Sequence, residues 1–192
     1  MKKINISVLG STGSIGINTL AVISKKRNLF SVNTLSANAN YIKICNQLSK
    51  FNPKNFIIVN KKTLKKVKKK FKYSKTNFYS GYKDIPISTK QNDITVAAIP
   101  GLNGLEPTIE FTKKSKKILL ANKESIICGW KLLQNVAKKN NTEIIAIDSE
   151  HFSIKELLKN YPDIEIEKIY ITASGGPFLN IKKKMFKKIK PI

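Results

Sequence analysis

The sequence predicts an α/β fold built around a doubly wound, parallel sheet. Short apolar runs of strand length alternate with segments whose apolar residues recur at helical spacing. A glycine-rich loop directly follows the first apolar run and opens the first helical segment. With 192 residues, 41% of them hydrophobic and 25% charged, the chain can bury the core of one domain, or of one domain and part of another.

Strands and helices alternate strictly in the first third of the chain. Ile4–Leu9 is an apolar run of strand length, and Ile15–Ser24, behind the glycine loop, has apolar residues at helical spacing. Phe30–Leu35 and Phe56–Val59 are again strand-like, and Tyr41–Leu48 between them is helical. Such β-α-β alternation favours parallel pairing, because each helix carries the chain back across the sheet.

The segment Lys61–Lys75 is rich in lysine. Its apolar residues Leu64, Val67 and Phe71 follow the spacing of an amphipathic helix, which predicts an ordinary helix with a solvated lysine face. A nucleic-acid site is the alternative, and it is disfavoured because no aromatic residues interleave with the lysines.

The same alternation continues in the second half. Asp93–Ile99 is a strand-like run, and Pro107–Phe111 opens a helix, since proline is tolerated in a first helical turn. A strand, a helix and two further strands are then expected in order, at Lys117–Leu120, Ile126–Ala137, Glu143–Ile147 and Lys168–Thr172.

Lysine supplies nearly all of the positive charge. The chain has 36 Lys and Arg against 12 Asp and Glu, a net charge of +24, yet Arg27 is its one arginine. Lysine, isoleucine and asparagine together make up 82 of the 192 residues. This composition favours drift toward AT-rich codons over a selected polyanion site, where arginine would be the better base contact and stacker. We expect no specific nucleic-acid partner; a basic polyanion-binding protein is the alternative of a different class.

Targeting and redox signals are few. No apolar run approaches the ~18 residues that a membrane span needs, so no membrane association is expected. The N-terminus MKKINISVLG passes straight into the first strand and lacks the pattern of a signal peptide. Cys45 and Cys128 are far apart and form no CxxC motif, which predicts reduced, buried thiols and a cytoplasmic protein.

The glycine loop Gly10-Ser-Thr-Gly-Ser-Ile-Gly16 carries the first candidate site. Gly10 allows a tight turn, Gly13 lets the backbone approach a pyrophosphate, and Gly16 lets the helix pack closely. The context is typical of a Rossmann-like dinucleotide site, with a structural glycine turn as the alternative. The later segment 36–40 holds no carboxylate that would repel a 2′-phosphate, which favours NADPH, although its nearest cation is Lys43.

Two polar motifs follow strands, where ligands bind in open α/β sheets. In Asn122-Lys123-Glu124-Ser125 the lysine can hold a phosphate or oxyanion, or Asn122 can cap a helix. In Asp148-Ser149-Glu150-His151 the two carboxylates project from one side if the chain is extended, which suits Mg²⁺ or Mn²⁺. The alternative is helix capping by Asp148 or Ser149, and His151 is expected to be a hydrogen-bonded structural residue.

The last motif is Ala173-Ser-Gly-Gly-Pro-Phe178. Consecutive glycines behind a strand can form an anion-binding nest, to which Ser174 would add a hydroxyl, and a simple loop is the alternative.

Together and in this order, GSTGSIG, KKILLANKES, DSEH and TASGGPF resemble the 1-deoxy-D-xylulose 5-phosphate reductoisomerases, from Ile4 to Phe178. The resemblance implies a Rossmann-like NADPH-binding domain at 1–125, followed at 126–192 by the first part of an α+β catalytic domain. It implies conversion of 1-deoxy-D-xylulose 5-phosphate, a phosphorylated sugar, to 2-C-methyl-D-erythritol 4-phosphate in non-mevalonate isoprenoid biosynthesis. NADPH and Mn²⁺ or Mg²⁺ would be required, and the full-length protein would be a homodimer.

The resemblance also implies roles for single residues. Lys123, Asp148 and Glu150 would be catalytic, and the two carboxylates would be metal ligands. Substrate contacts would come from Lys123, Ser149, Glu150 and Ser174. Cofactor contacts would come from the glycine loop and from the ends of two later strands: Gly10, Thr12, Gly13, Ser14, Ile15, Asn40, Asn122 and Glu124.

The sequence departs from the family pattern at Ala39, in the segment Phe152–Glu156 that follows DSEH, and in its extent. Ala39 stands where many relatives have a lysine, which weakens the expected affinity for a 2′-phosphate. The family's third metal carboxylate, its lid over the substrate and its C-terminal helical domain have no counterpart up to Ile192. We therefore expect the 192-residue chain by itself to bind NADPH weakly and to be catalytically poor, with an inactive NADPH-binding remnant as the alternative.

Overall fold

The computed structural model describes residues 2–86, 92–159, 161, 166–170 and 181–188. The contacts divide the chain into two units, Met1–His151 and Phe152–Ile192. The domain boundary predicted between residues 125 and 126 concerns function rather than contacts, and it stays a prediction. In the described part of the chain, no helix combines the length and the apolarity that crossing a membrane requires.

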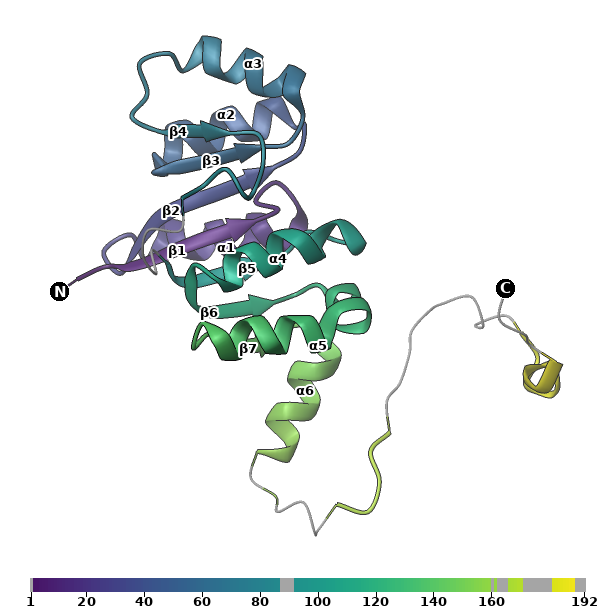
Figure 1. The fold of residues 1–192 in the computed structure, drawn as a ribbon. Helices are drawn as coiled ribbons and strands as arrows, with labels where there is room; N and C mark the ends of the chain where they lie inside the picture. Colours follow the sequence, from purple (N-terminus) through teal and green to yellow (C-terminus); the bar gives the residue numbers. More distant parts are fainter. Residues whose placement is uncertain (1, 87–91, 160, 162–165, 171–180, 189–192) are drawn as a thin grey trace. The chain divides into compact units, whose positions relative to one another are not determined.

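Seven parallel strands form one sheet in the first unit, in the order β4-β3-β2-β1-β5-β6-β7 (Figure 1). The order reverses beside β1, which confirms the predicted doubly wound parallel sheet. The α+β portion expected after it stays a prediction. The strands are β1 Ile4–Leu9, β2 Phe30–Ala37, β3 Asn55–Ile58, β4 Asn77–Tyr79, β5 Asn92–Ala97, β6 Ser115–Leu120 and β7 Glu143–Ala146.

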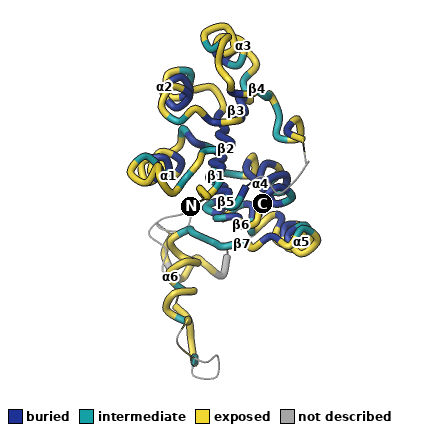
Figure 2. Tube along the Cα trace, turned by 90° about the vertical axis from the view of Figure 1, so that its left-hand side faces the viewer, coloured by how far each residue is buried: buried dark blue, intermediate teal, exposed yellow. Residues whose placement is uncertain are grey.

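Helices cover both faces of this sheet. Helices α1 and α2 lie on one face, and α4 and α5 lie on the other (Figure 2). The α-helices are α1 Ser14–Lys25, α2 Tyr41–Phe51, α3 Lys61–Lys70, α4 Leu105–Thr112, α5 Lys123–Lys139 and α6 Ser149–Leu158, and the 3₁₀-helices are η1 Leu102–Gly104 and η3 Lys183–Lys188.

The strands read as continuous apolar runs because both faces of the sheet are buried. In β3, Phe56, Ile57 and Ile58 are all fully buried. Phe56 and Ile58 belong to one core cluster, and Ile57 belongs to another. The same holds in β1 for Val8 and Leu9, so neighbouring residues of one strand pack under opposite helix layers.

Asparagine caps three of the helices that follow strands. The Oδ1 atoms of Asn40, Asn60 and Asn122 accept the backbone N–H three residues on, at 3.1, 2.9 and 2.9 Å. Each cap satisfies an N–H that the first helical turn leaves unpaired. The caps fix where α2, α3 and α5 begin, at the edge of the sheet where the preceding strands end.

Some element boundaries differ from the prediction. Helix α5 begins at Lys123 rather than Ile126, because Asn122 caps it, and α4 begins at Leu105 with Pro107 in its first turn. Helix α3 ends at Lys70, with Val67 fully buried and its lysines exposed, as the amphipathic pattern predicts. Residues 166–170 form no strand, so the strand expected at 168–172 is wrong for its described part; residues 171 and 172 lie outside the described residues.

Both cysteines are free thiols, and they differ in burial. Cys45 is buried in the core cluster under α2, as predicted. Cys128 is exposed, so the prediction of a buried thiol is wrong there, because α5 presents this position to solvent.

Replacing Asp93 with asparagine is expected to lower the free energy of unfolding at neutral pH by about 1 kcal/mol. Its carboxylate accepts hydrogen bonds from Lys116 Nζ at 2.7 Å and from the Asn5 backbone at 2.8 Å. These bonds, from Lys116 first and then from Asn5, lower the pKa of Asp93. A lowered pKa stabilises the fold above the ordinary Asp value of about 3.9. This stabilisation disappears as the pH falls through the lowered value.

Urea unfolding of both proteins checks this prediction. The difference in unfolding free energy should stay constant down to about pH 5 and vanish at lower pH. Glu143→Gln is the matched control, because the Lys117–Glu143 pair also joins β6 to its neighbour, at 2.8 Å, but both side chains are about half exposed (50% and 53%). An equal loss from both substitutions would contradict the assignment of the larger effect to the backbone hydrogen bond from Asn5 and to the lower exposure of Asp93, which is 30%.

Candidate active site

Two adjacent cavities lie at the edge of the sheet where the parallel strands end. The larger, of about 570 Å³, is lined by the glycine loop and by the ends of β2, β3 and β5. The smaller, of about 240 Å³, is lined by the ends of β5, β6 and β7. Both share the wall Ala98, Ile99 and Pro100, which follows β5. This is the position at which open α/β sheets bind ligands, on either side of the point where the strand order reverses.

The glycine loop lines the larger cavity through Gly10, Thr12 and Gly13. Gly10 has φ +79°, and a Cβ there would lie 2.7 Å from the Ala98 carbonyl oxygen, so only glycine fits the turn. A Cβ on Gly16 would lie 2.6 Å from Ser11 Cα, so α1 packs directly on the loop. At Gly13 a Cβ would have only one neighbour, Gly10 O at 3.4 Å, which leaves the backbone open to a ligand.

Helix α2 holds this loop in place through two side chains one turn apart. Gln47, which is buried, accepts from Ser11 Oγ at 2.6 Å and donates to Ser11 O at 2.8 Å. Lys43 Nζ donates to Thr12 O at 3.2 Å. The predicted residue Asn40 is exposed at the start of α2 and caps it. Asn40 is not among the described residues that line the two cavities.

The remaining loop residues divide between the cavities. Thr12 and Gly13 line the larger one, and Ile15 lines the smaller one. Ser14 is the first residue of α1 and is exposed. Backbone N–H groups of this first turn have no helical acceptor, so they are available to an anion.

Asn122 ties the shared wall to α5. Its Nδ2 donates to Ile99 O and to Gly101 O, the latter at 2.8 Å, while its Oδ1 caps the helix. The capping interpretation is therefore confirmed, and the two amide protons are used within the protein. Its role as a cofactor contact stays a prediction. Lys123 and Glu124 follow it in the lining of the smaller cavity.

Asp148 and Glu150 line the smaller cavity together, but through the helix cap that the sequence offered as the alternative and not through an extended chain. Glu150 lies in the first turn of α6, so the two residues are not part of one extended strand. Asp148 instead caps the helix: its Oδ1 accepts from His151 N at 3.1 Å and contacts His151 Nδ1 at 2.7 Å. The predicted hydrogen bonding of His151 is confirmed, and its structural role stays a prediction.

Asp148 and Glu150 both have pKa values below the ordinary values of their side chains. Burial opposes ionisation of Asp148, but the hydrogen bonds and charge of His151 outweigh it, so the pKa of Asp148 lies below its ordinary value. The other oxygen, Oδ2, is buried and has no hydrogen-bond partner. The Ser149 hydroxyl, at 2.8 Å, and the nearby Lys123 lower the pKa of Glu150. Lys123 Nζ lies 3.9 Å from Glu150 Oε1.

Sequence reasoning missed several walls of the larger cavity. Asn103, Glu106 and Pro107 come from η1 and α4, and Val59 follows β3. Tyr82 comes from the loop after β4. The rule that ligands bind where strands end would have indicated Ala98–Pro100, had it been applied to β5. Ser174, the predicted phosphate contact, lies outside the described residues.

Comparisons with known proteins agree with this geometry. Residues 6–129 match the family of 1-deoxy-D-xylulose 5-phosphate reductoisomerase, and residues 144–192 match the C-terminal domain family of the same enzyme. A 1-deoxy-D-xylulose 5-phosphate reductoisomerase from Pelagibacter ubique is 42% identical over 98% of this chain and 49% of its own length. The chain thus spans about half the length of the curated relatives it matches.

Solved structures give the same result. The reductoisomerase from Zymomonas mobilis in complex with NADPH superposes with a TM-score of 0.78 at 30% identity, over 94% of this chain and 48% of that one. A DOX-P reductoisomerase in complex with NADPH, fosmidomycin and magnesium gives a TM-score of 0.80 at 30% identity, over 97% of this chain and 49% of that one. From the matched residues and the shared fold, the chain belongs to the 1-deoxy-D-xylulose 5-phosphate reductoisomerase family.

Proposed function

We propose that this chain binds NADPH in the larger cavity and contributes two metal-ligating carboxylates to an enzyme that converts 1-deoxy-D-xylulose 5-phosphate to 2-C-methyl-D-erythritol 4-phosphate. The observation that carries the proposal is the wall Ala98–Pro100, which both cavities share. Hydride transfer requires a nicotinamide and a substrate in contact. Because the two cavities share these three residues, ligands bound in them would be neighbours.

The larger cavity fits a dinucleotide. The loop has no side chain at Gly10, Gly13 or Gly16, and a Cβ at two of these positions would collide with backbone atoms. The N–H groups at the start of α1 suit a pyrophosphate. Thr12, Gly13, Ser14 and Ile15 would hold it, with Gly10 shaping the turn, while Asn40, Asn122 and Glu124 would contact other parts of the cofactor. Residues 36–40 bring no negative charge near a 2′-phosphate.

The smaller cavity fits the first ligands of a hard divalent cation. Asp148 Oδ2 is buried and has no hydrogen-bond partner, so it is available as a metal ligand. Glu150 lines the same cavity. Among the described residues, no group of three or more His, Cys, Asp or Glu is arranged to hold a metal. Asp148 and Glu150 therefore supply part of a coordination shell.

When bound, Mn²⁺ or Mg²⁺ acts as a Lewis acid on the oxygens of the substrate, and NADPH supplies the hydride. The chain's own residues position the reaction. Lys123 places an ammonium beside Glu150, where it can bind an anionic oxygen of the substrate. Ser149 and Glu150 would bind substrate hydroxyls, and Ser174 is proposed to contact the phosphate.

The proposal also covers location and assembly. We place the protein in the cytoplasm, which its two free thiols support. In its full-length form we expect a homodimer. We expect no specific nucleic-acid partner, because no aromatic residues interleave with the exposed lysines of α3. An inactive NADPH-binding remnant and a basic polyanion-binding protein are the competing functions.

Titrating the 192-residue chain with NADPH and with NADH, followed by nicotinamide fluorescence, tests the proposal. We expect saturable binding that is tighter for NADPH. With Mn²⁺ and 1-deoxy-D-xylulose 5-phosphate present, the enzyme function predicts slow substrate-dependent oxidation of NADPH by this chain alone, whereas a remnant binds NADPH without any turnover. Failure to bind either nucleotide would contradict the proposal. Tight binding of duplex DNA that persists at physiological salt would favour the polyanion-binding function instead.

A further inference from the structure

The loop between β4 and β5 supplies one wall of the larger cavity through Tyr82. Its hydroxyl donates to Ser36 Oγ at 3.4 Å. Ser36 Oγ also accepts from the Gly10 backbone N–H at 3.0 Å. The tyrosine thus bridges the end of β2 and the glycine loop. Burial raises the pKa of Tyr82, so its hydroxyl stays protonated at neutral pH and remains a donor.

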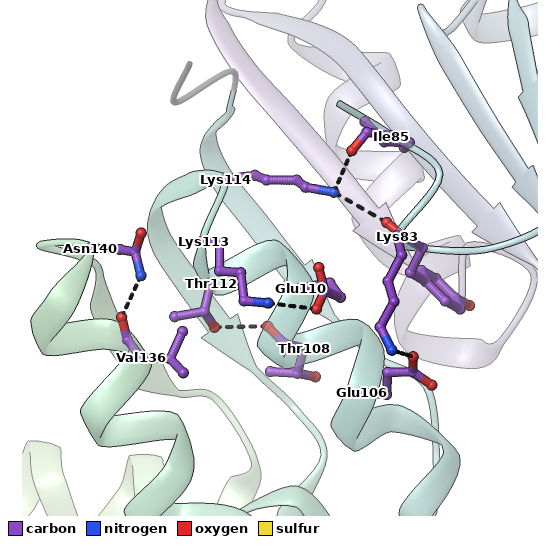
Figure 3. Close-up of polar contacts among 11 residues, drawn as sticks. Lys83, Ile85, Glu106, Thr108, Glu110, Thr112, Lys113, Lys114, Val136 and Asn140 are labelled. Atoms are coloured by element: carbon purple, nitrogen blue, oxygen red, sulfur yellow. Dashed lines mark hydrogen bonds and ion pairs between the residues drawn. The ribbon is translucent and has the colours of Figure 1, made fainter. Parts of the chain in front are cut away.

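Lys114 holds this loop from the opposite side. It follows α4, is only 2% exposed, and donates from Nζ to Tyr82 O at 3.1 Å and to Ile85 O at 2.8 Å (Figure 3). Its ammonium also lies 5.7 Å from the centre of the Phe111 ring. Burial lowers the pKa of Lys114, and the charge of Glu110 offsets this only in part.

The loop has further attachments. Lys83 pairs with Glu106 of α4 at 2.9 Å, and Asp84 accepts from Gly81 N at 2.8 Å. Both are exposed and contribute little to holding the loop. The buried ammonium is the strong attachment, since its two carbonyl partners would lose their hydrogen bonds if it were removed.

A lysine is an expensive residue to bury when an apolar one would fill the space. Here the two hydrogen bonds of Lys114 go to the backbone carbonyls of Tyr82 and Ile85. The contact therefore fixes the position of the Tyr82 backbone relative to α4. This favours a role in shaping the cavity over a general role in stability.

The position of Tyr82 indicates which part of a dinucleotide it faces. The end of β2 is the ribose-binding position of such folds, and Ser36, Ala37 and Asn38 there line the same cavity as Tyr82. A partly buried aromatic ring at this place can pack flat against a nucleobase or ribose, and such stacking is insensitive to the base.

We propose that Tyr82 is a further cofactor-binding residue that packs against the adenosine part of NADPH, and that Lys114 is the positioning residue that holds it there. The proposal rests on the proposed function, because it assigns the larger cavity to NADPH. It adds a cofactor contact from a segment that carries none of the sequence motifs.

Calorimetric titration with adenosine 2′,5′-bisphosphate, which carries the adenosine half alone, tests the contact. Tyr82→Ala is expected to weaken binding about tenfold, within the range measured for the loss of one stacked base. Tyr82→Phe, which keeps the ring, should restore most of the lost affinity. Binding of nicotinamide mononucleotide should not respond to either change. Equal affinity of Tyr82→Ala and the unmodified chain for the bisphosphate would overturn the proposal.

Lys114→Met tests the positioning role, with Lys113→Met as the matched control. Lys113 is the adjacent lysine, and its ammonium pairs with Glu110 at 2.7 Å rather than with the loop. Lys114→Met should weaken binding of the bisphosphate and speed amide hydrogen exchange in residues 81–85, whereas Lys113→Met should do neither. Faster exchange without a loss of affinity would mean that Lys114 is only a structural anchor, and would overturn its assigned role.

A double-mutant cycle separates positioning from general destabilisation. If Lys114 acts through Tyr82, adding Lys114→Met to Tyr82→Ala should cause little further loss of affinity. Additive losses would overturn the proposal. If the unmodified chain bound neither the bisphosphate nor NADPH, the proposed function would fail together with this inference. If the unmodified chain bound both and Tyr82→Ala and Lys114→Met kept its affinity, this inference alone would fail.

Discussion

Replacing Gly16 with alanine is expected to lower the free energy of unfolding by about 3 kcal/mol, the upper end for overpacking, and to abolish measurable binding of NADPH. The added Cβ would collide with backbone atoms of Gly10 and Ser11, at 2.6 Å from Ser11 Cα. Because the obstacles are backbone rather than flexible side chains, α1 must move away from the loop. Urea unfolding and NADPH fluorescence titration would measure the two effects.

Gly13→Ala is the matched control in the same loop. Its Cβ would meet only Gly10 O at 3.4 Å, an ordinary contact, so the fold should lose little stability. Binding of NADPH should still weaken, because the methyl group stands where the pyrophosphate approaches the backbone. Unaltered unfolding of Gly16→Ala would refute the close-packing account of this glycine.

Replacing Asp148 with asparagine is expected to weaken binding of Mn²⁺ at least about tenfold, a loss of more than 1 kcal/mol. The substitution removes the negative charge and replaces one carboxylate oxygen with an amide nitrogen, which is not a metal ligand. Helix α6 should persist, because an asparagine Oδ1 can still accept from His151 N, and asparagine caps helices about as well as aspartate. Electron paramagnetic resonance of free Mn²⁺ during a titration would give the affinity.

Glu143→Gln controls for the general loss of one negative charge. Glu143 lies on β7, the strand that leads into Asp148, but its carboxylate pairs with Lys117 at 2.8 Å. We expect no change of Mn²⁺ affinity from it. If Asp148→Asn also left the affinity unchanged, Asp148 would be a helix cap alone, and the metal site would have to be sought elsewhere.

The fold could be predicted from sequence where a single physical cause dominates. Asn55–Ile58 and Ile4–Leu9 are strands buried on both faces, so their apolar runs indicate parallel strands without further information. Gly10 and Gly16 reveal the loop because no other residue fits their turn and close contact. Strand β4 was missed, because its three residues are too few to show a period.

The site was predictable as a set of motifs and less so as a geometry. Asp148 and Glu150 do share a cavity, but through the helix cap that the sequence left open as the alternative, since two carboxylates at this spacing fit either an extended chain or a helix start. Tyr82 and Lys114 carry no local signal at all, because their contact joins segments 32 residues apart in the chain. Such partners are set by packing of the whole sheet, which periodicity cannot report.

The strand order also has a consequence for how the chain is made. Strand β1 lies at the centre of the finished sheet, yet its second neighbour, β5, begins only at Asn92. The Ser7 hydroxyl of β1 donates to the Asn92 side chain across 85 residues of sequence. During synthesis from the N-terminus, β1 to β4 can therefore assemble while one side of β1 still has unpaired backbone groups. A bare apolar edge of this kind invites pairing with another chain. We expect nascent chains that stall before residue 92 to aggregate, and chaperone binding to be concentrated in that interval.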